Sequence, residues 1–306
     1  MSGPAFGYRL ADVFAQRPYQ GNGVAVFLDA PSMLTEELQT VTVEVRQFES
    51  AFLWSTAEPS VFDTRIFVVD RELEFAGHPV LGAGSVLHER LLSSLRTATE
   101  AERLQPRTWT LRLGGRNVSV TSRAAGVDAF DVSMDQGAPA FGDPMPPAYR
   151  ARVAHALSLE PADLHADLPI QWASTGLKYL IIPVRGDALA RTRIATGSFG
   201  DLLAEAGAML AYVLDPDARE GRNWVNDGSV EDIATGSASG PAAAYLVRHR
   251  RADPSTPINL HQGRFLGRPS TMTVDVEGES QRIARVVLSG HVCMTGTGVL
   301  DHPPTR

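Results

Sequence analysis

The sequence has a single cysteine, Cys293, and a single lysine, Lys178, among its 306 residues. One cysteine excludes an internal disulfide and every metal knuckle that is built from several thiolates. One lysine leaves pyridoxal chemistry with one candidate for a Schiff base, and Lys178 lies beside a strand-like segment without other phosphate-binding signals. The sequence therefore gives little support to thiol, metal–thiolate or pyridoxal chemistry.

Membrane-spanning, secreted and nucleic-acid-binding proteins have features that are also missing. No apolar run approaches the roughly 20 residues of a membrane helix, and the first six residues lack the charged and apolar regions of a secretion signal. A net charge of −7 and a pI near 5.6 argue against a nucleic-acid-binding surface. We therefore expect a cytoplasmic protein that binds neither nucleic acid nor membranes.

A stretch that combines two acidic residues, a small turn and an alanine-rich helix runs from Glu231 to Leu246. The free N–H groups of a first helical turn, together with the positive end of the helix dipole, form a site for an anion. Gly236 lets a ligand approach the backbone closely. Ser237 or Ser239 also fits a simple helix cap. By itself, the stretch leaves an anion site and an ordinary cap as alternatives.

A second stretch of the same build lies half a chain earlier, from Phe75 to Leu87. It also runs from a glycine through a polar residue into a helix of small and apolar residues, and Gly77 and Gly236 are 236 − 77 = 159 residues apart. Two such units predict a duplicated architecture in which two helix N-termini face one cleft.

Motifs for the common catalytic classes are missing. The chain has no Gly-x-Gly-x-x-Gly, no nucleotide-type phosphate loop and no Gly-x-Ser-x-Gly elbow. Its eight histidines include no pair with metal-ligand spacing, so a metal site would have to be assembled from the distant residues His78, His261 and His291. What remains is acid–base chemistry without a cofactor or a metal, on an anionic substrate.

Hydrophobic patterning predicts many strands and only a few helices, which indicates an α+β protein. Helices are predicted from Thr35 to Val45, after Gly77, from about Ala148 to Leu157 and after Gly236. The strand pattern restarts near Val127. We therefore expect an N-terminal lobe over residues 1–126 and a C-terminal lobe over residues 127–289.

Four ordered motifs resemble those of one enzyme family. Phe75–Pro79 and Glu231–Ala238 look like the two hallmark motifs of the phenazine-biosynthesis PhzF family, which is similar in fold to diaminopimelate epimerase. Asp12–Val26 and Glu49–Phe52 agree in order and spacing. The resemblance implies two pseudo-symmetric lobes, each a curled, mostly antiparallel sheet around a central helix. It also implies that the last strand, within residues 290–306, returns to the N-terminal lobe.

The same resemblance implies roles for seven residues. Glu49 matches the catalytic glutamate, His78 lines the site, and Asp232 matches the acid that holds a polar group of the substrate. On the residues alone, Glu49 also fits a solvent-exposed helix end, His78 a packed or capping histidine, and Asp232 a solvated turn residue. The apolar neighbours of Glu49 would raise its pKa and help it exchange protons. The expected substrate-binding residues are Asn22, Gly77, Gly236 and Ser237.

The related epimerases place a thiol at each helix N-terminus, whereas here His78 and Ser237 hold those places and Cys293 lies elsewhere. We therefore expect an isomerase in which one carboxylate moves a proton and shifts a double bond. Its substrate would be a small unsaturated carboxylate derived from an amino acid, in secondary-metabolite biosynthesis. Gly23 and Phe48 depart from the family pattern, so the exact substrate stays open.

Two alternative functions stay open. The oligomeric state also stays open, and a homodimer is one candidate. An epimerase or racemase would use Glu49 with a second base. A non-catalytic protein would keep the pocket only to bind a small carboxylate. Deuterium from solvent at an unchanged stereocentre would favour the epimerase, and a moved double bond would favour the isomerase.

Overall fold

The computed structural model describes residues 4–95, 99–195 and 197–304, and every structural statement below concerns this part of the chain. The chain divides into two compact units. The first unit contains Met1–Asp135 and Ser289–Arg306, and the second contains Gln136–Leu288. The division falls later than residue 126, where the sequence pattern restarts. The reason is that β8 (Ala129–Gly137) pairs antiparallel with β7 (Arg116–Gly126) of the first unit.

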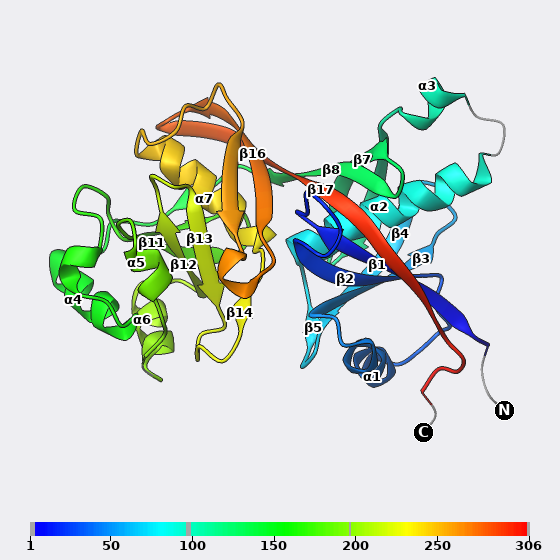
Figure 1. Ribbon diagram of the computed structural model, residues 1–306, viewed down its shortest axis with the longest axis horizontal. Helices are drawn as coiled ribbons and strands as arrows, with labels where there is room; N and C mark the ends of the chain where they lie inside the picture. Colours follow the sequence, from blue (N-terminus) through cyan, green and yellow to red (C-terminus); the bar gives the residue numbers. More distant parts are fainter. Residues whose placement is uncertain (1–3, 96–98, 196, 305–306) are drawn as a thin grey trace. The chain divides into compact units, whose positions relative to one another are not determined.

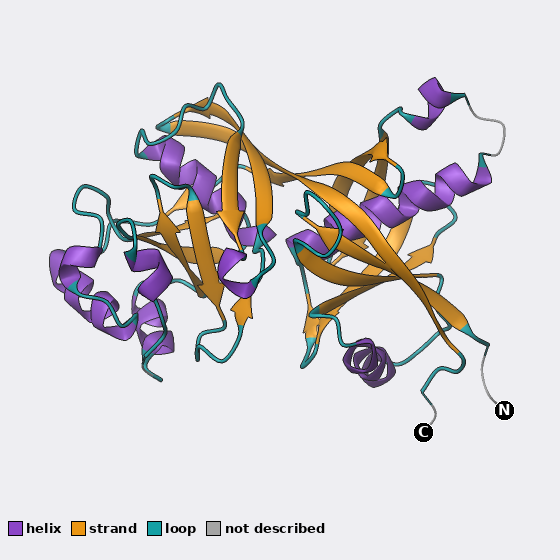
Figure 2. Cartoon of the chain, viewed as in Figure 1, coloured by secondary structure: helices purple, strands orange, loops and turns teal. Residues whose placement is uncertain are grey.

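The first unit is built from strands around one long helix (Figures 1 and 2). Besides β7 and β8, its elements are β1 (Phe6–Val13), β2 (Asn22–Leu28), α1 (Thr35–Val45), β3 (Glu49–Ser55), β4 (Val61–Val68), β5 (Glu72–Leu73), α2 (Gly77–Ser94), α3 (Glu100–Arg103) and β6 (Arg107–Leu113). The end of β17 (Arg282–Leu300) also belongs here, because it pairs antiparallel with β1 from Val292 to Leu300.

Helix α2 is the central helix of the first unit, and its residues from Gly77 to His88 are buried. Two of its glycines allow the strands to pack directly against the helix. A Cβ atom on Gly82 would lie 2.6 Å from Val24 Cγ1, and one on Gly84 would lie 2.7 Å from Val120 Cγ2. Larger residues at these places would push the strands away, because protein interiors are close-packed.

Helix α1 covers an apolar cluster in which the rings of Phe27 and Phe52 stack, with their centroids 4.5 Å apart. The helix begins where the Glu37 carboxylate accepts a hydrogen bond from the Leu34 N–H at 2.7 Å. It ends at Val45, and the next residue, Arg46, adopts a left-handed backbone conformation (φ 53°). This turn brings the chain into β3, whose first residue is Glu49.

The second unit has the same kind of architecture around α7 (Gly236–Arg248), whose residues from Ala238 to Val247 are buried. Its other elements are β9 (Ala140–Phe141), α4 (Pro147–Ala156), η1 (Pro161–Asp163), β10 (Gln171–Ser174), β11 (Lys178–Pro183), α5 (Ala188–Arg191), α6 (Phe199–Glu205), β12 (Leu210–Asp215), β13 (Glu220–Trp224), β14 (Glu231–Asp232), β15 (Ile258–Gln262), η2 (Arg264–Leu266) and β16 (Ser270–Glu279). The two acidic residues before the predicted turn, Glu231 and Asp232, form the short strand β14, which the sequence did not predict.

The order of strand pairings in the second unit repeats that in the first. In the first unit β1 pairs antiparallel with β2, β2 parallel with β3, β3 antiparallel with β4, and β4 antiparallel with β5 and parallel with β6. Strands β10 to β15 repeat each of these pairings in the same order and direction. The first pair of the parallel ladder is Val24 with Glu49 in one unit and Tyr179 with Leu210 in the other.

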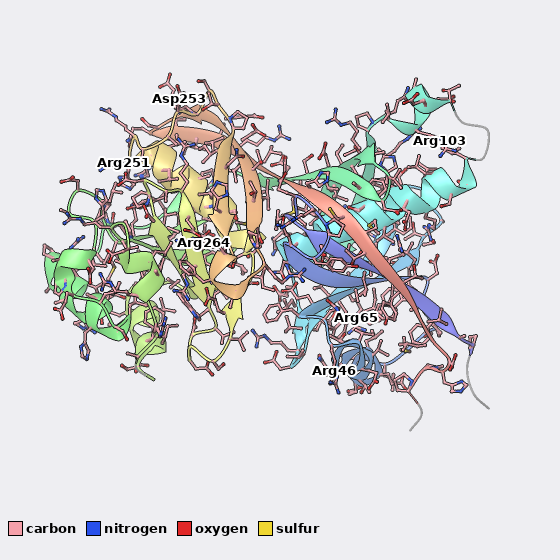
Figure 3. The ribbon with its side chains drawn as sticks, viewed as in Figure 1. Arg46, Arg65, Arg103, Arg251, Asp253 and Arg264 are labelled. Atoms are coloured by element: carbon pink, nitrogen blue, oxygen red, sulfur yellow. The ribbon has the colours of Figure 1, made fainter. Side chains whose placement is uncertain are left out.

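An arginine–glutamate pair holds the short strand before the central helix in each unit. Arg65 of β4 donates two hydrogen bonds to Glu72 of β5 and one to Thr35, which places it beside α1 (Figure 3). Arg222 of β13 donates two hydrogen bonds, both 2.7 Å long, to Glu231 of β14. Glu72 and Glu231 are 231 − 72 = 159 residues apart, and each arginine lies two residues before the partner of its glutamate in the ladder, so the two pairs correspond in structure.

None of the helices in the described part of the chain combines the length and the apolar character that crossing a membrane requires.

Candidate active site

Glu49 is buried at the beginning of β3, with 7% of its surface exposed. It is held there by the sheet, because it pairs with Val24 in β2 and with Val68 in β4. Since α1 already ends at Val45, Glu49 does not have the position at a solvated helix end that the sequence also allowed. The side chain of Glu49 is therefore largely removed from water.

His78 is the second residue of α2 and is 3% exposed. Its Nδ1 atom lies 3.4 Å from Asn22 Nδ2 and 3.8 Å from Glu49 Oε2. Burial lowers the pKa of His78 to about 3, and a hydrogen bond with the Gly23 backbone raises it by less. The imidazole is therefore neutral at neutral pH, and its contact with Glu49 is not an ion pair.

The free ring nitrogen of His78 is chemically significant. Its Nε2 atom is buried and has no hydrogen-bond partner in the described part of the chain. A buried polar atom of this kind is uncommon in proteins and costs about 1–3 kcal/mol when nothing binds it. A neutral imidazole can supply either a donor or an acceptor there.

Three of the residues that the sequence singled out thus come together in the first unit. Asn22 at the start of β2 and Glu49 at the start of β3 are placed near each other by the parallel pairing of these strands, and His78 at the start of α2, which packs on them, contacts both. Gly77, the first residue of α2, is buried next to His78.

Gly23, one of the two departures from the family pattern, leaves room for a neighbouring side chain. A Cβ atom on Gly23 would lie 2.7 Å from the Gln47 Oε1 atom and 3.7 Å from Asp12 Oδ1. The space that a larger side chain would fill is therefore taken by the Gln47 carboxamide. Phe48, the other departure, is partly buried.

In the second unit a network of hydrogen bonds holds the turn before α7. Asp232 accepts a hydrogen bond of 2.7 Å from the Thr235 hydroxyl. Gln262, the last residue of β15, accepts from the Thr235 N–H at 3.2 Å and donates to the Asp232 carbonyl at 2.8 Å. Gln136 donates to the Gly236 carbonyl at 3.0 Å. The network leaves the turn rigid, with Ser237 partly exposed at its end.

Two tyrosines lie close to this turn, and sequence reasoning did not find them. The Tyr179 Oη atom is 2.7 Å from Ser237 Oγ. The Tyr212 hydroxyl is buried without a hydrogen-bond partner in the described part of the chain, and burial, with Asp232 and Glu220 nearby, raises its pKa. In the sequence Tyr179 and Tyr212 belong to short apolar strands, so only an alignment of the two halves of the chain would have singled them out.

Comparison of the two units shows that their polar groups differ. Leu210 in the second unit has the place of Glu49, and Ser237 has the place of His78. Conversely, the residues in the first unit that correspond to Asp232, Thr235 and Gln262 are all apolar, namely Leu73, Ala76 and Leu113. One unit therefore has a carboxyl–imidazole pair, and the other has a hydroxyl-rich helix start.

The histidines considered for a metal site have other partners. His261 interacts with Thr271 at 3.3 Å, and His291 with Asp131 at 2.9 Å. In residues 4–95, 99–195 and 197–304, no group of three or more His, Cys, Asp or Glu side chains is arranged to hold a metal ion.

Comparison with known proteins identifies the family. The model of the phenazine biosynthesis-like proteins, PhzC-PhzF, matches residues 11–298. The chain belongs to this family. A trans-2,3-dihydro-3-hydroxyanthranilate isomerase from Pseudomonas aeruginosa is 32% identical to this PhzF-like chain over 296 residues, which is 93% of this chain and 95% of that protein.

Solved structures agree with the family assignment. One that is described as a predicted epimerase from Pseudomonas aeruginosa is 43% identical, covers 96% of this PhzF-like chain and 99% of its own, and has a TM-score of 0.86. A hydroxyproline epimerase from Agrobacterium vitis is 13% identical, with a TM-score of 0.59 and a coverage of 99% and 95%, so it shares the fold alone. The resemblance of the motifs to the PhzF family is thereby confirmed, and the chain is an isomerase.

Proposed function

We propose that this PhzF-like enzyme moves a proton, and with it a double bond, in a small unsaturated carboxylate derived from an amino acid. The reaction needs no cofactor, and Glu49 is the general acid and base. The observation that carries the proposal is the burial of Glu49 beside a neutral His78, whereas Leu210 holds the corresponding place in the second unit. A single carboxyl group, with no carboxyl group at the corresponding place in the second unit, suits the transfer of a proton between two carbons on the same face of a substrate.

The proton balance is simple. The Glu49 carboxylate takes a proton from an sp³ carbon, and the electrons of the broken C–H bond form a new double bond within the conjugated system. The former double bond provides the electrons that take up a proton from Glu49 at a second carbon. The carboxylate is regenerated, and neither an oxidant nor a reductant is consumed. Neutral His78, and with it Asn22, would position the substrate atom at which charge develops.

The start of α7 is proposed to bind the substrate carboxylate. The backbone N–H of Gly236 and the Ser237 hydroxyl are suitable donors, and the positive end of the helix dipole favours an anion there. Asp232, which already accepts from Thr235, would hold a polar group of the substrate such as an amino group. Gly77 would give the substrate close access to the start of α2, because it has no side chain.

The two units are proposed to be copies of one ancestral fold whose sites have diverged. Support comes from the repeated pairing order and from the two arginine–glutamate pairs. The relatives named for trans-2,3-dihydro-3-hydroxyanthranilate suggest a similar substrate in phenazine-type secondary metabolism.

The test is Glu49→Gln, which keeps the shape of the side chain but cannot take a proton from carbon. With trans-2,3-dihydro-3-hydroxyanthranilate as the first substrate tried, turnover should fall by about 10²–10⁴-fold, the usual loss for a general base, with little change in substrate affinity. Cys293→Ser is the control, because the buried thiol donates only to the Ala15 carbonyl and a hydroxyl can replace it. Normal turnover by Glu49→Gln would refute the assignment.

An epimerase is the second candidate, because one solved relative is described as a predicted epimerase. Such a reaction needs a second base, and Leu210, which has the place of Glu49 in the second unit, cannot serve as one. Turnover in deuterium oxide separates the two candidates. An isomerase moves the double bond, whereas an epimerase introduces deuterium at a stereocentre and leaves the bonds of the substrate where they were.

A further inference from the structure

The hydroxyl groups of Tyr179 and Ser237 form a short hydrogen bond at the start of α7, with 2.7 Å between the two oxygen atoms. Tyr179 is 1% exposed, whereas Ser237 is partly exposed. The buried phenol therefore lies behind a serine that a ligand can reach. Tyr179 comes from the first pair of the parallel ladder between β11 and β12, so the sheet fixes its position relative to the helix.

The fold does not require a tyrosine at this place. In the first unit the corresponding residue is Val24, which has the same position in the ladder between β2 and β3 and packs against Gly82 of α2. A small aliphatic residue is thus sufficient to join the sheet to its central helix. Tyr179 is larger and brings a hydroxyl to the place where the second unit has Ser237 instead of His78.

We propose that Tyr179 is a positioning residue, which directs the Ser237 hydroxyl toward the carboxylate of the substrate; this inference rests on the proposed function of the α7 start. When the Tyr179 O–H donates to Ser237 Oγ, the only hydrogen of the serine hydroxyl is left for the ligand. The chain of two hydrogen bonds then ends on a charged acceptor, and bonds of this kind are the strong ones. The second unit thereby selects a substrate that carries a carboxylate.

Tyr212 supports the same specialisation of the second unit. Its counterpart in the first unit is Ala51, and Gly221 makes room for its ring, since a Cβ atom on Gly221 would lie 2.1 Å from Tyr212 Cζ. The second unit thus has two buried phenols near Asp232 and Ser237, where the first has aliphatic residues.

The experiment is a double-mutant cycle with Tyr179→Phe, Ser237→Ala and the double variant. The readouts are the dissociation constant of 3-hydroxyanthranilate, a stable aromatic analogue of the relatives' substrate, and the separate values of KM and kcat. Ser237→Ala should weaken binding about 10- to 100-fold, because it removes a hydrogen bond to a charged group. Tyr179→Phe should weaken it about 3- to 10-fold and raise KM without lowering kcat comparably. The double variant should bind no more weakly than Ser237→Ala if Tyr179 affects the ligand through the serine.

Tyr149→Phe is the matched control, since it removes another buried phenol of the second unit, one that donates to the Leu202 carbonyl. Tyr149→Phe should leave the affinity for the analogue unchanged, while lowering the free energy of unfolding about as much as Tyr179→Phe does. The positioning role would be overturned if the losses of affinity in the cycle were fully additive, or if Tyr179→Phe bound the analogue as tightly as the wild type. An unchanged Ser237→Ala, or a wild-type enzyme that does not bind the analogue, would instead overturn the carboxylate site of the proposed function, and the role of Tyr179 with it.

Discussion

Acidification should destabilise this protein partly through His78, and replacement of His78 should remove that part of the pH dependence. Burial lowers the pKa of His78 to about 3, whereas an unfolded histidine has a pKa of about 6.5. Between about pH 3 and about pH 6.5 this histidine therefore binds a proton in the unfolded chain but not in the folded chain. The free energy of unfolding therefore falls as the pH decreases below about 6.5, and this contribution is fully present only above that pH.

The magnitude follows from the linkage of proton binding to folding. Each pH unit below about 6.5 costs about 1.4 kcal/mol, so acidification from pH 6.5 to pH 5 should cost about 2 kcal/mol at this site alone. The opposing influence is the Glu49 carboxyl, whose Oε2 atom lies 3.8 Å from His78 Nδ1. A carboxylate at this distance would raise the pKa of His78 if its attraction exceeded the cost of burying the imidazolium.

The assay is urea unfolding of the wild type and of His78→Asn at several pH values between 5 and 7.5. The difference in unfolding free energy between the two proteins should change by about 2 kcal/mol over this range, with the wild type losing more on acidification. His302→Asn, which removes an exposed imidazole, is the control and should follow the wild type. Parallel curves, or an NMR titration that places the pKa of His78 at 6.5 or above, would show that Glu49 outweighs burial.

Two further predictions concern stability and cofactors. Glu231→Gln should lower the free energy of unfolding by about 3–5 kcal/mol, because it leaves Arg222 buried without its carboxylate. Glu72→Gln, at the corresponding and more exposed pair, should lower it by about 0–1 kcal/mol. Urea unfolding of both variants measures the two losses, and equal losses would contradict the difference in burial. Treatment with a chelator or with borohydride should leave turnover unchanged, because the sequence has no metal-ligand spacing and only one lysine; a loss on chelation that added metal restores would refute this.

Local sequence was sufficient to predict the elements that lie next to the site. Thr35 to Val45 forms the predicted helix, and helices begin at Gly77 and Gly236 as the glycine motifs indicate. These predictions succeed because helix starts and ends depend on a few neighbouring residues. The short strand at Glu231 and Asp232 was missed, since it is formed only through pairing with β13.

The sequence by itself determined the family and the duplicated motifs 159 residues apart, because motif residues and their spacing can be compared directly along the chain. Only the tertiary structure decided which side chains reach each motif. Tyr179 and Leu210 take the places of Val24 and Glu49 through the register of two parallel ladders. Such a register joins strands that are distant in sequence and is set by the packing of the whole sheet against its helix, so no local pattern encodes it.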